Sequence, residues 1–204
     1  DSACQALTWE ETHAAIDAMK EAKVFITGFG MPFKKALDGA KIAKEEYGMT
    51  TFCNVSPLPS GDMGDLSYLD YMVLNDVEAR TLCDLPEDSD EPMRNIAEKL
   101  RKKFNCKGVI ITCNSEGSVI LDGKEYWKVS PTLVKAVDTI GAGDGYLAAV
   151  AANLVWGKSM KEATEWASKY AAYKVTRPGS MTRRPGCGYP QKEDVDAFMA
   201  SLEK

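Results

Sequence analysis

A single stretch decides the fold of this chain: Val137-Asp138-Thr139-Ile140-Gly141-Ala142-Gly143-Asp144-Gly145-Tyr146. An apolar run, Leu133 to Val137, precedes it, and an Ala- and Leu-rich helical pattern begins near Asp144. We therefore expect a strand-to-helix turn whose small residues let the backbone approach a ligand closely. The helix N-terminus adds a partial positive charge, so this turn is expected to bind an anion.

Asp144, at the start of the expected helix, has two interpretations. A carboxylate in the first helical turn stabilises the helix dipole, which is a purely structural role. The same carboxylate beside a bound phosphate would act as a general base for an attacking hydroxyl. The local sequence favours neither interpretation, so the rest of the chain has to decide.

The composition excludes several classes of protein. The chain has 204 residues, of which 45% are hydrophobic, and its formal net charge is −5, which argues against a dedicated nucleic-acid binder. The single histidine and the absence of paired cysteine motifs argue against a zinc site or a disulfide framework. No apolar run is long enough to span a bilayer. We expect a soluble, cytoplasmic protein that binds neither nucleic acid nor membrane.

The periodicity predicts an alternation of helices and strands. Helices are expected over residues 8–22, 37–47, 75–82, 93–104, 145–155, 159–175 and 191–202. Strands are expected over 24–27, ending at Gly28, and over 50–55, 71–74 and 108–112, with a hairpin over 118–127. Such an alternation is typical of an α/β fold with a mostly parallel sheet and right-handed crossovers. Ligands then bind outside the carboxyl ends of the strands. We find no internal repeat or linker, so a single domain over residues 1–204 is expected.

The segment Asn75-Asp76-Val77-Glu78 follows the third expected strand. An amide and a carboxylate three residues apart lie on one face of a helix, where they would hold a hydrated Mg²⁺ and a phosphate oxygen. Asn at a helix start is also a common N-cap. Both interpretations stay open on this segment alone.

The stretch from Asp138 to Asp144 is similar to the C-terminal signature of the ribokinase-like carbohydrate kinases, also called the phosphofructokinase-B family. The resemblance implies a three-layer α/β/α fold and transfer of the γ-phosphoryl group of ATP to a sugar hydroxyl. It gives Asp144 the role of general base. It gives the amides of Gly141, Ala142 and Gly143 the role of stabilising the transferring phosphoryl group.

The resemblance extends to two turns that would bind nucleotide and Mg²⁺. The family carries an Asn-x-x-Glu motif associated with Mg²⁺ and phosphate, which here corresponds to Asn75 for the nucleotide and Glu78 for the metal. The family also carries a Thr-x-Gly-x-x-Gly turn that contacts the nucleotide. The nucleotide-binding residues of that turn would be Thr112, Asn114, Ser115 and Gly117, with Asn114 in place of the first glycine. Asn tolerates a left-handed backbone, so the turn is expected to form.

The resemblance also implies a site for a monovalent cation, K⁺. Its ligands would be Asp138 and the carbonyl of Ile140, together with the carbonyls of Lys174, Arg177 and Gly179 in the later loop. The alternative is that these last three residues simply form the loop that ends a helix.

The resemblance covers nearly the whole chain but not the whole family pattern. The family's N-terminal portion, with further strands, the lid sheet and most sugar contacts, is not present in this sequence. We therefore expect the C-terminal, nucleotide-binding part of a longer kinase, and we expect this chain alone to be inactive. A homodimer is implied for the full-length protein.

The acceptor stays open at this stage. Ribose or a related carbohydrate is the first expectation, although Gly30 stands where ribokinases place a sugar-contacting Glu. The segments Gly28-Phe29 and 186–190 are slightly similar to adenosine kinase, so a nucleoside is the alternative acceptor. A non-catalytic nucleotide-binding fragment or paralogue is the alternative from a different class.

Overall fold

A computed structural model describes residues 6–30, 32–181, 184 and 186–202. In this part of the chain the elements are α2 (Trp9–Ala18), β1 (Val24–Gly28), α3 (Phe33–Glu45), β2 (Thr50–Asn54), β3 (Tyr71–Asn75), α4 (Asp76–Leu82), α5 (Met93–Phe104), β4 (Gly108–Thr112), a 3₁₀ turn (Asn114–Glu116), β5 (Ser118–Asp122), β6 (Glu125–Val129), α6 (Ala142–Val155), α7 (Met160–Val175) and α8 (Lys192–Leu202). The chain divides into two compact units. The first comprises residues 1–112 and 119–127, and the second comprises residues 113–118 and 128–204.

The strands form one sheet in the order β1-β2-β3-β4-β5-β6. The first four pair in parallel, as the alternation of elements predicts. Asn75 at the end of β3 is the register partner of Thr112 at the end of β4. The parallel pairing therefore brings two of the predicted site residues to the same edge of the sheet.

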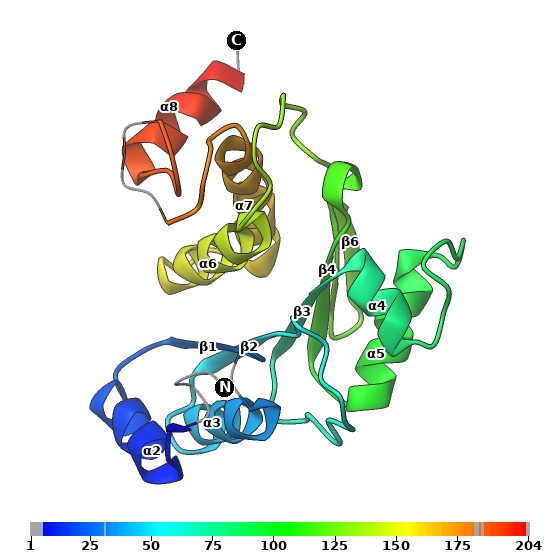
Figure 1. Cartoon of the computed structure of the whole chain (residues 1–204), viewed down its shortest axis with the longest axis vertical. Coiled ribbons are helices and arrows are strands. Elements are labelled where there is room, and N and C mark those ends of the chain that lie inside the picture. Colours follow the sequence, from blue (N-terminus) through cyan, green and yellow to red (C-terminus); the bar gives the residue numbers. More distant parts are fainter. Residues whose placement is uncertain (1–5, 31, 182–183, 185, 203–204) are drawn as a thin grey trace. The chain divides into compact units, whose positions relative to one another are not determined.

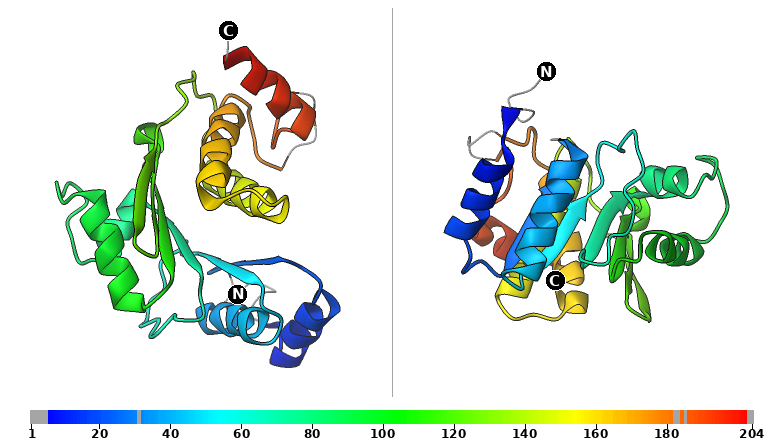
Figure 2. Two further views of the ribbon diagram at one scale, coloured as in Figure 1. Left: turned by 180° about the vertical axis from the view of Figure 1, so that it is seen from behind. Right: turned by 90° about the horizontal axis from the view of Figure 1, so that it is seen from below.

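Helices cover the sheet of the first unit. Figure 1 shows α3 against β1 and β2 and α5 against β4, and the two further views in Figure 2 agree. The crossovers that carry these helices connect neighbouring parallel strands in sequence order, so right-handed crossovers place them on one side of the sheet. The carboxyl edge is left to the loops.

The strands β3 and β4 are buried on both faces, which explains their continuous apolar sequences. The helix α5 is amphipathic and buries Ile96, Ala97, Leu100 and Phe104. It ends at Asn105, whose φ of 55° gives the left-handed cap that Asn accepts more readily than most residues. Burying the Ile96, Leu100 and Phe104 side chains stabilises the fold by roughly 1.5–3 kcal/mol each.

A buried carboxylate fixes the start of β3. Asp70 is 8% exposed. It accepts hydrogen bonds from the Lys44 ammonium at 2.9 and 2.7 Å and from the Thr51 amide at 3.0 Å. Because an unpaired buried charge is costly, this set of bonds holds α3 and β2 at a defined position against β3.

The second unit is built on a helical pair. The helices α6 and α7 lie side by side, and α8 packs against α7 (Figures 1 and 2). The small residues of α6 permit this close packing, and Ala149 and Ala151 are buried. The Tyr146 hydroxyl lies 3.0 Å from the Ser118 hydroxyl, so this buried tyrosine keeps a hydrogen-bond partner.

The structure confirms most of the expected elements and corrects two of them. The first helix ends at Ala18, earlier than the predicted residue 22. The prediction of a strand over 133–137 is wrong, because this run is irregular and Leu133 and Val137 are 85% and 62% exposed. The Val137 and Asp138 amides both donate to the Val175 carbonyl, which gives this segment a partner at the end of a helix instead of in a sheet. In the described part of the chain, no helix has the length and apolarity to cross a membrane.

Candidate functional site

The signature segment is held by the carboxylate of Asp138. Its Oδ1 accepts the Ile140 amide at 2.9 Å, and its Oδ2 accepts the Gly179 amide at 2.7 Å. These two backbone hydrogen bonds lower the pKa of the Asp138 carboxyl, and the Lys174 charge lowers it further. Asp138 is therefore an anion that ties the signature to the later loop.

The helix α6 begins immediately after this segment. Its N-cap is Gly141, whose φ of 76° is left-handed. A Cβ at this position would lie 2.4 Å from the Tyr189 hydroxyl oxygen, so both backbone and packing require glycine. The Ala142 amide donates to the Thr139 carbonyl at 3.1 Å. One of the three amides expected to meet phosphate therefore has a partner within the turn.

Open space surrounds Gly143, which lies in the first turn of α6. A Cβ built on it would meet no atom within 4 Å, so packing does not explain the glycine. Gly145 differs, because a Cβ there would lie 3.0 Å from Tyr170 Cε1 and 3.2 Å from Tyr189 Cε1. The signature glycines thus have two functions: Gly141 and Gly145 accommodate aromatic rings, and Gly143 leaves the helix start approachable.

Asp144 is exposed in the same first turn. Tyr189 lies near it, and the pKa of that phenol is raised first by burial and then by the Asp144 charge. The carboxylate is therefore on the solvent side of the helix start, and not in the packed interior. In this position it serves the helix dipole and is also within reach of an incoming group.

The turn after β4 forms as predicted. Asn114 has a φ of 48°, so it adopts the left-handed backbone for which the family pattern has glycine. The Cys113 amide donates to the Gly117 carbonyl at 2.8 Å and closes the turn. Gly117 has φ 89° and ψ −131°, and a Cβ there would lie 2.0 Å from the Val129 carbonyl oxygen. Asn114 and Ser115 are exposed, and Thr112 donates to the Leu74 carbonyl at 3.5 Å.

Asn75 and Glu78 form a reciprocal capping box at the start of α4. The Glu78 amide donates to Asn75 Oδ1 at 2.8 Å, and the Asn75 amide donates to Glu78 Oε2 at 2.8 Å. The structural interpretation of Asn75 as an N-cap is therefore confirmed. Asn75 is exposed and Glu78 is half-buried, so the cap leaves this carboxylate open to solvent. In the described residues, no cluster of three or more His, Cys, Asp or Glu side chains has the geometry of a metal site.

Two of the residues expected to bind a monovalent cation, Asp138 and Ile140, instead bind the side-chain ammonium of Lys174. Lys174 is 0% exposed, and its Nζ donates to the Asp138 carbonyl at 3.1 Å and to the Ile140 carbonyl. The Lys174 carbonyl accepts the Arg177 amide at 3.0 Å. The Gly179 amide is the donor to Asp138 described above. Of the expected ligand atoms, the Asp138 carboxylate and the Ile140 and Lys174 carbonyls thus have partners within the protein.

The side chain of Arg177 points to a different part of the same loop. Its Nε donates to the Gly188 carbonyl at 3.1 Å, and one terminal nitrogen donates to the Cys187 carbonyl at 3.0 Å. Its other terminal nitrogen lies 3.5 Å from the Asp194 carboxylate. Arg177 therefore orders the loop before α8.

Sequence reasoning missed two residues of this site, the Lys174 ammonium and the Tyr189 ring. The one sequence feature that pointed to the Lys174 ammonium was a lysine in the last turn of an Ala- and Tyr-rich helix. No local pattern identifies Tyr189, because its ring meets Gly141 and Gly145, which lie more than forty positions earlier.

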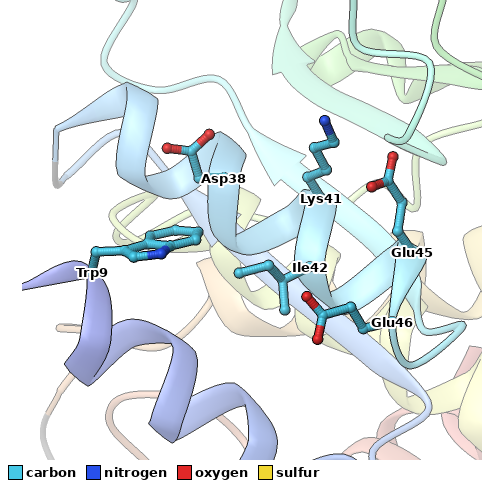
Figure 3. A pocket seen from close by; sticks show the side chains of 6 residues that line it. All are labelled: Trp9, Asp38, Lys41, Ile42, Glu45 and Glu46. Atoms are coloured by element: carbon cyan, nitrogen blue, oxygen red, sulfur yellow. The ribbon is translucent and has the colours of Figure 1, made fainter.

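The pocket shown in Figure 3 is lined by residues from another part of the sequence. It is an open groove of about 370 Å³ between α2 and α3, lined by Trp9, Asp38, Lys41, Ile42, Glu45 and Glu46. Its walls contain none of the predicted site residues. Three carboxylates and one lysine give it a net negative charge, which does not suit a phosphate.

The fold and the signature helix define a class of protein, the ribokinase-like α/β kinases. The chain matches the pfkB family of carbohydrate kinases over residues 2–186, and it belongs to this family. It is 34% identical to a ribokinase of Schizosaccharomyces pombe over 164 residues, covering 76% of this chain and 51% of that protein. It is 32% identical to adenosine kinase 1 of Arabidopsis thaliana over 139 residues, covering 64% of this chain and 38% of that protein.

Solved structures confirm the expected three-layer α/β/α class. The Thermotoga maritima ribokinase superimposes with a TM-score of 0.77 at 26% identity, covering 91% of this chain and 59% of that one. An Arabidopsis thaliana ribokinase complexed with ribose and ATP gives a TM-score of 0.74 at 22% identity, covering 94% of this chain and 59% of that one. The phosphofructokinase-2 of Escherichia coli in complex with potassium superimposes with a TM-score of 0.68 at 17% identity, covering 97% of this chain and 64% of that one. The chain spans about half the length of the curated ribokinases it matches.

Proposed function

We propose that the complete protein is an ATP-dependent phosphotransferase that phosphorylates a hydroxyl of ribose or a related carbohydrate. The observation that carries this proposal is the start of α6, where the approachable Gly143 and the exposed Asp144 share one helical turn. Membership of the pfkB carbohydrate kinases and the ribose and ATP bound by a structural neighbour support it.

The mechanism assigns electrostatic and positional roles to this turn. The amide of Gly143 and the dipole of α6 would stabilise negative charge on the transferring phosphoryl group. Asp144 would accept the proton of the acceptor hydroxyl as that oxygen bonds to the γ-phosphorus and the bond from this phosphorus to the bridging oxygen breaks, releasing ADP. Such a base contributes about 10²–10⁴-fold in rate. Asn114, Ser115 and Thr112 would position the nucleotide after β4.

Glu78 fits a role in holding Mg²⁺ through water. One of its carboxylate oxygens accepts the Asn75 amide, and the half-buried side chain keeps solvent access. Mg²⁺ in such a position would neutralise phosphate charge. The expected monovalent-cation ligands do not fit in the same way, because Lys174 donates to the Ile140 carbonyl. We therefore assign no step to K⁺.

The replacement Asp144→Asn in the complete protein tests the assignment. It retains shape and hydrogen-bonding capacity but is not a base, so we expect ATP binding to persist and turnover to fall by about 10²-fold or more. Isothermal calorimetry would measure binding, and a coupled assay would measure transfer to ribose, deoxyribose, hexoses and adenosine. Undiminished turnover by this variant would reject Asp144 as the base.

A nucleoside kinase is the second candidate, and the similarity to adenosine kinase 1 favours it. In the same assay, a rate with adenosine above the rates with all sugars would establish this alternative. A nucleotide-binding fragment or paralogue without catalysis is the third candidate. ATP binding without transfer to any acceptor, by the complete protein, would identify it.

We also propose that residues 1–204 form one ribokinase-like domain of a cytoplasmic enzyme that is a homodimer at full length. Free thiols at Cys53, Cys83, Cys106 and Cys187 support a reducing compartment. Cell fractionation and light scattering of the complete protein would test these proposals.

A further inference from the structure

The interaction that the family resemblance does not explain is the burial of the Lys174 side chain. Lysine is almost never fully buried unless its charge is compensated. Lys174 is 0% exposed, and its ammonium donates to two backbone carbonyls, those of Asp138 and Ile140. These carbonyls belong to the signature segment, immediately before the N-cap of α6.

The surroundings of Lys174 match those of a bound monovalent cation. Two carbonyl dipoles face the ammonium, and the Asp138 carboxylate is close enough for the Lys174 charge to act on it. An ammonium and a potassium ion carry the same charge, and both accept carbonyl oxygens as partners. A lysine that donates to these oxygens therefore occupies the position at which a free cation would bind them.

The position of the charge has a consequence for the helix start. In a trans peptide the carbonyl and the following amide point in opposite directions. Holding the Ile140 carbonyl toward Lys174 therefore fixes the direction of the Gly141 amide on the opposite side of the same peptide. The ammonium also adds positive charge beside a turn that is proposed to bind phosphate.

We propose that the ammonium of Lys174 replaces the monovalent cation in this chain and fixes the signature loop without added K⁺. Occupancy of the site by lysine does not depend on catalysis. The consequence for catalysis, a rate independent of K⁺, does rest on the proposed kinase function.

Thermal unfolding in choline, sodium and potassium chlorides at constant ionic strength tests the proposal on the chain itself. We expect the wild-type Tm to be the same in all three salts. Lys174→Ala removes the ammonium and leaves space for an ion, so its Tm should fall in choline chloride. Potassium or ammonium chloride should then restore roughly 3–8 °C in a saturable manner. Lys169→Ala, an exposed position on the same helix, is the matched control and should show no cation response.

Two results would overturn the proposal. One is a saturable rise of the wild-type Tm with K⁺ relative to choline, which needs no variant to fold. The other is a folded Lys174→Ala variant that no monovalent cation stabilises. In the complete protein, the coupled assay adds a separate readout: wild-type turnover should be independent of K⁺, and Lys174→Ala should require it. If the complete protein transfers no phosphoryl group, the kinase proposal fails while the Tm measurements still decide the cation proposal.

Discussion

The carboxylate of Asp138 and the amide of Gly179 lie 2.7 Å apart, although they are 41 positions apart in the sequence. The same carboxylate accepts the Ile140 amide through its other oxygen. Asp138 therefore joins the segment that begins α6 to the loop that follows α7. Because hydrogen bonds to an ionised acceptor are stronger than neutral ones, this junction depends on the charge of one side chain.

Asp138→Asn should lower the Tm at pH 7, because the amide presents a single acceptor oxygen to two backbone donors. The effect should depend on pH. The folded pKa of Asp138 lies below the ordinary value of 3.8. Its contribution to stability is therefore present above that value and disappears as the pH falls through the folded pKa. Calorimetric scans of both proteins from pH 7 to acid should show their Tm values converging in acid. A constant difference would contradict the role of the charge.

Gly143→Ala tests whether a ligand approaches the start of α6, and Gly145→Ala tests the packing of the same turn against aromatic rings. Alanine at Gly143 meets open space, so the Tm should stay constant or rise. Its methyl group would crowd the phosphoryl group, so turnover of the complete protein should fall by about 10²-fold. Alanine at Gly145 meets Tyr170 and Tyr189 and should cost about 1–3 kcal/mol of stability. Full activity of a stable Gly143→Ala variant would contradict phosphate binding at this turn.

Comparing Glu78→Gln with Glu78→Ala distinguishes the helix-capping function of Glu78 from its proposed function in binding Mg²⁺. Gln at this position also satisfies the N-cap amide, so Glu78→Gln should change the free energy of unfolding by less than about 0.5 kcal/mol. It removes the charge, so the complete protein should need about tenfold more Mg²⁺ for half-maximal rate. Glu78→Ala should lose about 1 kcal/mol of stability as well. An unchanged Mg²⁺ requirement in Glu78→Gln would leave Glu78 as a cap only.

Gly117→Ala should disrupt the turn after β4. Its backbone is left-handed and its Cβ would lie 2.0 Å from the Val129 carbonyl oxygen, so the loss should be about 3 kcal/mol or more. Gly123 provides the control, because its φ is also positive but its surroundings are open. Gly123→Ala should cost only about 1 kcal/mol. Equal losses from chemical denaturation of the two variants would contradict the packing argument.

The buried thiols should resist alkylation. Burial raises the pKa of Cys53 to about 12 and that of Cys106 to about 11. At pH 8 their thiolate fractions are then on the order of 10⁻⁴ and 10⁻³, so both should react with iodoacetamide only after unfolding. The half-buried Cys83 and Cys187 should react before the buried Cys53 and Cys106. Mass spectrometry of peptides after timed labelling would measure this order, and early modification of Cys53 would contradict it.

The sequence by itself determined the class of fold and the positions of most elements. Strand and helix periods are local, and each capping box, such as those at Thr8, Asn75 and Ser159, lies within four consecutive residues. The signature stretch likewise placed Asp144 in the first turn of a helix. These features depend on neighbours in the chain, so a single sequence contains them.

The tertiary structure alone decided what surrounds the signature. The run before Asp138 has the composition of a strand, but its amides bond to the end of α7, which local periodicity does not encode. Local periodicity likewise does not encode the position of the Lys174 ammonium, which lies where a cation was expected. It donates to the carbonyls of Ile140 and Asp138, which are 34 and 36 positions earlier in the sequence. Hydrogen bonds and charges act between atoms that are close in space, and only the folded chain determines which atoms those are.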